Sequence, residues 1–359
     1  SQNTMNIVFS TTRQWNPGDE FILLGCINLL KNVVNDLNPI IFNRNPQIRR
    51  DRKRDIIKSI DNLLGKDWAE KFLDNSVKDR LPFNYADCVV FAGSPEWRGR
   101  RLSKLYEFIY NNNLPTIFLG LGAGSKRSLP LNKETLSDLE IQVFKSAKLI
   151  SCRDCSSEKY TSDNELKLKV YNLPCPALFS SINEKTITSV KKIALIYGTH
   201  MATKANNISE ETHQYLIKLY NNILNQYSNC EINFIAHYID ELSYFKADFP
   251  NQKLFYSYDS KDYLEIYGKY DLVIGYRVHG IGISASMCIP GIMISHDSRS
   301  GTVDGFGASI INTNTNLNVA TNLIDDVIKN IHTKNAKLKE HKEKYKKEYI
   351  SLLSQALSK

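Results

Sequence analysis

One complete β-α-β unit lies in the stretch Leu272-Val-Ile-Gly275-Tyr-Arg277-Val-His279-Gly280-Ile-Gly-Ile-Ser-Ala-Ser-Met-Cys-Ile-Pro290-Gly291-Ile-Met-Ile-Ser295. The apolar run over residues 272–274 predicts a first strand, and the run over residues 291–295 predicts a second. Between them, the small and apolar residues 281–288 predict a buried helix. Because strands joined by a crossover helix run parallel, this unit indicates an α/β fold with a parallel sheet.

The same alternation of strands and helices extends along the rest of the chain. In the first half, the patterns predict strands at residues 6–11, 39–42, 88–92, 116–121, 149–152 and 166–171, with helices at 20–34, 51–64, 102–110, 133–147 and 155–161. In the second half, they predict strands at 192–197, 231–235, 253–256 and 309–312, with helices at 209–227, 239–246, 260–269 and 317–331. We therefore expect two similar sets of βα units.

Chain length and one change of character along the sequence predict two domains. At 359 residues, the chain exceeds the roughly 100–200 residues of one ordinary domain. Residues 173–192 contain two prolines and a polar run, which is typical of a crossing between domains. We expect an N-terminal α/β domain over residues 5–180, a C-terminal one over 181–332, and an amphipathic helix over 333–359.

The composition is typical of a globular protein. Hydrophobic residues make up 42% of the sequence and charged residues 23%, close to the globular average. The longest apolar run, residues 21–30, is shorter than the roughly 18 residues that a membrane-spanning helix needs. The single CxxC, Cys152 with Cys155, has no second pair at zinc spacing. We expect a cytoplasmic protein without a metal site.

The net charge of +8 is concentrated in two stretches, residues 44–58 and 333–347. Each holds seven Lys or Arg against two acids. Such stretches are either solvated surfaces or binding sites for phosphates, anionic lipid or nucleic acid. Residues 44–58 lack the interleaved aromatic residues of single-strand binders, so we expect no nucleic-acid partner. Peripheral contact of the first stretch with an anionic membrane surface stays open.

Gly18 and Asp19 lie in the first of several polar turns that follow predicted strands, within Asn16-Pro-Gly-Asp19. Ligands of open α/β sheets bind at the carboxyl ends of the strands. Backbone N–H groups at the start of a helix favour anions, and glycine allows a close approach. An ordinary capped turn, with Asp19 as the N-cap residue, is the alternative.

Two further turns follow the strands at residues 88–92 and 116–121. The first continues into Glu96 and Trp97, whose carboxylate and indole face suit the hydroxyls and C–H groups of a sugar. The second contains Gly122 and Gly124. It lacks the acid about 20 residues further on that a dinucleotide site requires, so we do not expect NAD binding.

Arg277 and His279 stand at the turn between the strand and the helix of the opening stretch. A guanidinium and an imidazole beside a helix start suit an anionic ligand. A single Arg or His near a turn is usually structural. Here the small-residue helix behind them and the polar turn at residues 296–299 favour a binding site instead.

The sequence Asp271-Leu-Val-Ile-Gly-Tyr-Arg277-Val-His279-Gly resembles the signature of the polysaccharide pyruvyl transferase family. The resemblance extends over residues 6–312 and includes Asn16-Pro-Gly-Asp19, Phe118-Leu-Gly-Leu-Gly-Ala-Gly124 and Ile150-Ser-Cys-Arg153-Asp154. It implies two Rossmann-like domains facing a cleft, as in GT-B glycosyltransferases. It also implies that the acceptor sugar binds the N-terminal domain and that phosphoenolpyruvate binds mainly the C-terminal one.

The resemblance implies transfer of an enolpyruvyl group from phosphoenolpyruvate to hydroxyls of a sugar or glycan precursor, whether free, phosphate-linked or lipid-linked. Cations must hold the carboxylate and phosphate of the donor. The candidates are Arg153, Arg277 and Arg299. His279 is the candidate general acid, and Asp19 or Glu96 is the candidate base. No cofactor is expected beyond phosphoenolpyruvate as co-substrate.

A glycosyltransferase that uses a nucleotide sugar is the alternative with the same architecture. It would need an acid near the C-terminal site for the ribose, and Glu265 is the best candidate in the sequence. A donor assay with phosphoenolpyruvate and with a nucleotide sugar separates the two enzymes.

Overall fold

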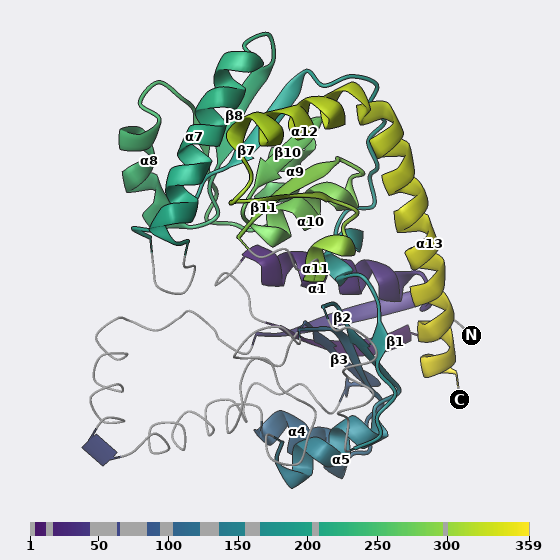
Figure 1. Cartoon of the computed structure of the whole chain (residues 1–359). Helices are drawn as coiled ribbons and strands as arrows, with labels where there is room; N and C mark the ends of the chain where they lie inside the picture. The colour runs from purple at the N-terminus through teal and green to yellow at the C-terminus, as the bar shows by residue number, and fades with distance from the viewer. Residues whose placement is uncertain are drawn as a thin grey trace. The chain divides into compact units, whose positions relative to one another are not determined.

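The computed structural model describes residues 4–11, 17–43, 63–64, 85–93, 103–122, 136–154, 166–202, 208–296 and 301–358. The chain divides into two compact units. The N-terminal unit comprises residues 1–15, 26–176 and 348–359, and the C-terminal unit comprises residues 16–25 and 177–347. Helices α1 (Pro17–Lys31) and α13 (Ile331–Leu357) therefore contribute residues to both units (Figure 1).

The two units are each assembled from separate segments, whereas the predicted domains were continuous. As a result, residues 16–25, which include Gly18 and Asp19, belong to the C-terminal unit and not to the N-terminal one. The predicted acceptor and donor roles of the two domains stay predictions.

A six-stranded parallel sheet forms the centre of the N-terminal unit, in the order β2-β1-β3-β4-β5-β6. Its strands are β1 (Thr4–Thr11), β2 (Asp36–Asn43), β3 (Cys88–Ala92), β4 (Thr116–Leu121), β5 (Leu149–Cys152) and β6 (Tyr171–Asn172). Every residue of β3, β4 and β5 is buried, as expected for central strands of a parallel sheet covered on both faces.

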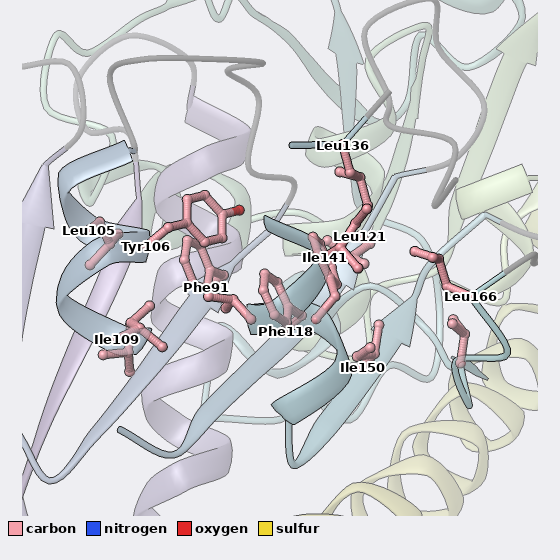
Figure 2. Packing of buried hydrophobic residues seen from close by; sticks show 14 of the residues in the cluster. Phe91, Leu105, Tyr106, Ile109, Phe118, Leu121, Leu136, Ile141, Ile150 and Leu166 are labelled. Atoms are coloured by element: carbon pink, nitrogen blue, oxygen red, sulfur yellow. The ribbon is translucent and has the colours of Figure 1, made fainter. Parts of the chain in front are cut away.

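Stacked aromatic rings form part of the core of this unit (Figure 2). The ring of Phe118 lies 4.6 Å from that of Phe91 and 4.2 Å from that of Phe144, measured between centroids. The rings come from β3, β4 and helix α5 (Asp138–Ser146), and Tyr106 of helix α4 (Ser103–Asn111) stacks on Phe91. Such pairs stabilise a core by about 0.5–1.5 kcal/mol each beyond the burial of their area.

Among the elements of this unit, two predictions differ most from the structure. Helix α5 begins at Asp138 rather than at residue 133, because Ser137 caps it in a capping box with Glu140. The predicted strand over residues 166–171 is wrong for most of its length, since only Tyr171 and Asn172 pair with β5. Lys167 has a positive φ of 52°, which is incompatible with a strand. The predicted helix at residues 155–161 lies outside the described residues, as does most of the one at 51–64.

A second six-stranded parallel sheet forms the centre of the C-terminal unit, in the order β12-β11-β10-β7-β8-β9. Its strands are β7 (Lys192–Ile196), β8 (Glu231–Ile235), β9 (Leu254–Phe255), β10 (Leu272–Gly275), β11 (Gly291–Ser295) and β12 (Ser309–Asn312). Along the chain, β7, β8 and β9 follow one another toward one edge of the sheet. Strand β10 then pairs with the other side of β7, and β11 and β12 continue toward the opposite edge. The strand order therefore reverses between β7 and β10, as in a Rossmann fold.

Helices cover both faces of this second sheet (Figure 1). Helix α7 (Glu210–Gln226) packs with α12 (Leu317–Lys329), and α9 (Asp262–Gly268) packs with α10 (Val278–Ser286). The remaining short helices are η4 (Ile239–Glu241), α8 (Leu242–Asp248) and α11 (Gly301–Asp304). Helix α10 begins three residues earlier than predicted, so His279 lies in its first turn. No helix in the described part of the chain is long and apolar enough to cross a membrane.

The predicted amphipathic helix at the C-terminus is present as α13. Its buried face includes Leu338, Tyr349 and Leu353. Within the C-terminal unit, this face also buries Lys342, one of the seven lysines of the basic stretch. Within the N-terminal unit, the Tyr349 hydroxyl donates to the carbonyl of Pro174 at 2.5 Å. The other basic stretch, residues 44–58, lies outside the described residues.

Candidate functional site

The candidate site lies at the carboxyl edge of the C-terminal sheet, where the strand order reverses. Strands β7 and β10 are direct neighbours there, with Leu195 in register with Ile274. Beyond them the chain continues into Gly198 and Arg277 respectively. Open α/β sheets bind their ligands outside the strand ends at such a switch point. The residues that follow β7, β8 and β10 therefore share one edge.

Arg277 is the N-cap residue of α10 and is held by three neighbours. Its guanidinium forms an ion pair and hydrogen bond with Glu241, whose side chain is fully buried. The guanidinium carbon also lies 5.1 Å from the ring centre of Tyr238, in cation–π distance. A Cβ placed on Gly198 would lie 3.5 Å from Arg277 Nη2, so the backbone approaches the guanidinium closely. These contacts fix the direction of the arginine.

Glu241 is an unusual partner because it is a carboxylate with no solvent exposure. Burial raises the pKa of Glu241, while the charge of Arg277 and its hydrogen bond act in the opposite direction. Removing one partner of such a buried pair leaves the other charge uncompensated, which is costly. The pair is therefore a fixed part of the site rather than an incidental surface contact.

His279 packs directly against Gly18 of helix α1. A Cβ on Gly18 would lie 2.5 Å from His279 Nδ1 and 2.6 Å from its Cγ. Real Cβ atoms do not tolerate such distances, so position 18 requires glycine while the imidazole stays in place. Pro17 is the first residue of α1, a position that favours proline. The first turn of α1 thus contributes a wall of the site.

Asp19 follows in the first turn of α1, where a negative charge is favourable. It lies close enough to Tyr238 to affect that phenol electrostatically. Burial raises the pKa of Tyr238 to about 12; Arg277 lowers it, and the charges of Glu241 and Asp19 raise it. The structure therefore brings Gly18, Asp19, Arg277 and His279 together within one unit.

His237 and Tyr267 lie buried beneath the start of α10. His237 Nε2 and the Tyr267 hydroxyl are 2.6 Å apart. Burial and, to a smaller extent, the positive charges of Arg277 and His279 lower the pKa of His237 to about 3. A Cβ on Gly280 would lie 2.6 Å from the Tyr267 oxygen, so glycine at this position allows α10 to pack onto the pair. His237 is therefore neutral at physiological pH.

Gly122 and Arg153 lie at the carboxyl edge of the N-terminal sheet, directly after β4 and β5. The backbone N–H of Arg153 donates to the carbonyl of Leu121 at 2.9 Å, which continues the pairing of the two strands. The predicted convergence of Arg153 with Arg277 and His279 stays a prediction. The other predicted site residues lie outside the described residues; they are Glu96, Trp97, Gly124 and Arg299. Among the described residues, no group of three or more His, Cys, Asp or Glu side chains is arranged to hold a metal ion.

A family model described as polysaccharide pyruvyl transferase matches residues 16–298. The chain belongs to the polysaccharide pyruvyl transferase family. The match includes Gly18, Asp19, Arg277 and His279 and confirms the resemblance deduced from the sequence. No curated protein matches this family member significantly.

Solved structures similar to this pyruvyl transferase family member include two that contain a uridine nucleotide. UDP-GlcNAc 2-epimerase from Neisseria meningitidis, bound to UDP-GlcNAc, aligns with a TM-score of 0.57 at 9% identity over 98% of this chain and 99% of the epimerase. MnaA from S. aureus, in a structure with UDP, aligns with a TM-score of 0.55 at 14% identity over 92% of this chain and 91% of MnaA. At these identities the likeness shows the fold alone. It confirms the predicted class, an α/β protein with two Rossmann-like domains of the GT-B type.

The sequence patterns did not predict three residues of the candidate site in this family member. His237, Tyr238 and Glu241 follow the end of β8 within the segment His-Tyr-Ile-Asp-Glu. A polar run directly after a strand was the available signal. The helical pattern over residues 239–246 concealed it, because that pattern assigns Glu241 to an ordinary helix rather than to the edge of the sheet.

Proposed function

We propose that this member of the polysaccharide pyruvyl transferase family transfers an enolpyruvyl group from phosphoenolpyruvate to two hydroxyls of a sugar or polysaccharide precursor. The products are a pyruvate ketal and phosphate. The observation that carries the proposal is the placement of Arg277 and His279 at the N-terminus of α10.

Helix electrostatics make this placement informative. The N-terminus of an α-helix presents unpaired N–H groups and a partial positive charge, so a cationic side chain there is unfavourable by itself. Arg277 caps α10 and His279 lies in its first turn. Glu241 is one counter-charge for Arg277. A ligand with a carboxylate and a phosphate would compensate the remaining positive potential, and phosphoenolpyruvate carries both groups.

The proposed reaction needs acid and base chemistry. Protonation of the methylene carbon of phosphoenolpyruvate turns it into a methyl group, while the first hydroxyl oxygen bonds to the neighbouring carbon. Loss of phosphate then leaves an oxocarbenium ion, which the second hydroxyl attacks. Two protons leave the two hydroxyls. In the net reaction, one proton becomes part of the new methyl group and the other ends on the released phosphate. No electrons are gained or lost overall, so we expect no redox cofactor and only phosphoenolpyruvate as co-substrate.

Two neighbouring side chains suit these proton transfers. His279 is proposed as the general acid, since histidine changes charge near neutral pH. Asp19 is proposed as a base for one hydroxyl. Its support is positional: Asp19 directly follows Gly18, which packs on the His279 ring. Arg277 would bind the anionic groups, together with Arg153 and Arg299 as proposed partners.

The acceptor is proposed to be a sugar bound by residues of the N-terminal unit. Gly122 at the edge of its sheet belongs to this proposal, as do Gly124, Glu96 and Trp97. A phosphate-linked or lipid-linked acceptor would suit the basic stretch at residues 44–58, which would place the enzyme at the cytoplasmic face of an anionic membrane. Glu96 is the second candidate base.

A nucleotide-sugar transferase is the second candidate function. The similar solved structures with UDP ligands share the fold, but a shared fold does not determine the substrate. This function would need an acid at the C-terminal site for the ribose. Glu265, its best sequence candidate, is an exposed residue of α9. The geometry therefore favours the phosphoenolpyruvate reaction.

Phosphate release distinguishes the two functions. Purified protein would be incubated with phosphoenolpyruvate and a panel of sugar, sugar-phosphate and lipid-linked acceptors. We expect acceptor-dependent release of phosphate and a ketal that retains both acceptor oxygens. Turnover of UDP-GlcNAc without any use of phosphoenolpyruvate would contradict the proposal.

A further inference from the structure

A hydrogen-bonded chain of three side chains lies in the C-terminal unit and includes a residue of the segment that follows β7. Asp248 Oδ2 is 2.8 Å from His213 Nε2. His213 Nδ1 is in turn 2.6 Å from His200 Nδ1. The residues come from the end of α8, the first turn of α7 and the segment after β7. We call this chain the Asp248–His213–His200 relay.

The relay ends at the same sheet edge as the candidate site. A Cβ built on Gly198 would lie 3.5 Å from Arg277 Nη2, so the segment after β7 passes near the guanidinium. His200 is two residues further along the chain, and two residues span at most about 7 Å. Tyr197 also senses the charge of Glu241, the ion-pair partner of Arg277. The relay and the arginine therefore flank the switch point between β7 and β10 from its two sides.

The hydrogen bonds determine which nitrogens carry protons. A carboxylate only accepts hydrogen bonds, so His213 must donate to Asp248 through Nε2–H. With this one proton on its ring, His213 presents an unprotonated Nδ1, which accepts from His200 Nδ1–H. His200 is consequently left with a lone pair on Nε2. The relay thus fixes the basic nitrogen of His200, in the way that an orienting carboxylate fixes a catalytic histidine.

Neighbouring groups hold the relay in this arrangement. The Tyr197 hydroxyl donates to Asp248 Oδ2 at 2.6 Å. Burial raises the pKa of Tyr197, as does Asp248, so the hydroxyl keeps its proton and stays a donor. His213 is 4% exposed, whereas His200 is half-buried. His213 is therefore shielded from solvent, whereas the His200 side chain is partly accessible.

A purely structural network explains His213 but not His200. Asp248 and Thr199 already offer partners to both ring nitrogens of His213, at 2.8 Å and 3.4 Å. His200 adds a shorter contact to the same Nδ1, and its own Nε2 makes no hydrogen bond to any residue that the structure describes. An oriented imidazole with an available lone pair is the arrangement that a general base requires.

We propose that His200 is a general base of this enzyme and that His213 and Asp248 are its positioning residues. This proposal rests on the proposed ketal-forming reaction, which must deprotonate two hydroxyls. As the second hydroxyl oxygen bonds to the oxocarbenium carbon, its proton moves to His200 Nε2. The positive charge of the oxocarbenium ion is thereby transferred to the imidazole, and Nδ1–H continues to donate to His213. The proton later leaves to solvent or to the released phosphate.

Three substitutions test the relay. His200→Gln removes the base, and kcat should fall by about 10²-fold, within the usual range for loss of a general base. Asp248→Asn keeps the shape but lets the side-chain amide donate to His213 Nε2, which reverses both histidine tautomers. We expect a similar loss of kcat. For both variants, the KM for phosphoenolpyruvate should change by less than about threefold, because these residues act in the chemical step. His332→Gln is the matched control: it makes the same histidine-to-glutamine change at an exposed position of α13 outside the relay, and kcat should be unchanged.

Nitrogen-15 NMR of the histidines supplies a readout independent of activity. The chain has seven histidines, so single His→Gln variants can assign the signals. In the wild type we expect His200 as the Nδ1–H tautomer and His213 as the Nε2–H tautomer, and both should reverse in Asp248→Asn. The Nε2–H tautomer for wild-type His200 would overturn the proposal.

The outcomes separate this proposal from the one it rests on. A wild-type protein that ignores phosphoenolpyruvate overturns the proposed function and, with it, this role of His200. A wild type that forms the ketal while folded His200→Gln keeps its kcat overturns only the relay. Circular dichroism and thermal melting of each variant establish that it is folded.

Discussion

The two ends of helix α10 both carry cations, but in opposite electrostatic settings. At the C-terminal end, Lys342 of α13 donates to the carbonyls of Ser286 and Ser181, at 2.7 Å and 3.0 Å. A cation there complements the partial negative charge of the helix end. At the N-terminal end, Arg277 and His279 add positive charge to a terminus that is already positive.

This electrostatic difference distinguishes a structural cation, Lys342, from the cations of the proposed binding site, Arg277 and His279. Lys342 is 5% exposed and has two carbonyls and Glu184, 3.5 Å away, to compensate its burial. Burial lowers the pKa of Lys342, and Glu184 acts in the opposite direction. The Lys342 end thus needs no ligand. The Arg277 end opposes the helix dipole, has Glu241 as its counter-charge and lies at the switch point of the sheet, so it is the end where we propose that an anionic substrate binds.

Loss of His279 should have the largest effect on activity. His279→Ala should lower kcat by about 10²- to 10⁴-fold, because a general acid contributes that much to a proton transfer. Binding of phosphoenolpyruvate should weaken much less. Steady-state kinetics and donor titration measure the two effects. His332→Ala, on the exposed surface of α13, is the control and should keep full activity. A weakened donor affinity with an unchanged kcat in His279→Ala would assign His279 to binding alone.

A methyl group on Gly18 should disturb the same imidazole without removing it. Gly18→Ala places Cβ within 2.5 Å of His279 Nδ1, so the ring must move. A displacement of about 1 Å in a catalytic group costs up to about 10²-fold in rate, and we expect a loss of kcat of that order. The double variant with His279→Ala should be no slower than His279→Ala alone. Additive losses would mean that Gly18 acts independently of His279.

Lys342→Met should affect stability and leave the reaction intact. The substitution leaves the carbonyls of Ser181 and Ser286 without this donor, a loss of about 1–3 kcal/mol in the free energy of unfolding. Urea unfolding measures that loss, and donor titration should give an unchanged affinity. A weakened affinity for phosphoenolpyruvate would break the contrast between the two ends of α10.

His237, which is buried beneath the Arg277 end of α10, should give the stability of the protein a pH dependence. Its pKa is about 3 in the folded protein against 6.5 for an ordinary histidine. Between these values the unfolded chain binds a proton that the folded protein does not, so stability falls as pH falls below 6.5. This one group should cost about 2 kcal/mol between pH 7 and pH 5. His237→Gln should remove that part of the slope in urea unfolding; an unchanged slope would contradict the assigned pKa.

The sequence predicted the bounds of the strands more accurately than the residues that form the candidate site. Strands β3, β4, β5, β8, β11 and β12 have the predicted bounds. Each is a short apolar run with polar or turn residues on both sides, which leaves little choice of ends. The run over residues 166–171 has a similar pattern of apolar residues. It does not form a strand over most of its length, and Lys167 has a positive φ there.

Part of the site could be located from the sequence because a helix start and a strand end mark it. Arg277 and His279 were found in this way. Glu241 and the Asp248–His213–His200 relay were not, since their partners lie 36, 35 and 13 residues apart along the chain. The membership of Gly18 in the C-terminal unit also depends on packing against His279, which no local pattern encodes.

Calorimetric titration of phosphoenolpyruvate into wild-type protein and into Arg277→Gln tests the central claim most directly. A charge-assisted contact to a carboxylate or phosphate contributes about 1.5–3 kcal/mol, so the account predicts wild-type binding and a roughly 10- to 100-fold weaker Kd in the variant. Parallel titration with UDP-GlcNAc should give no competition for this site. Wild-type protein that binds UDP-GlcNAc and ignores phosphoenolpyruvate would contradict the account.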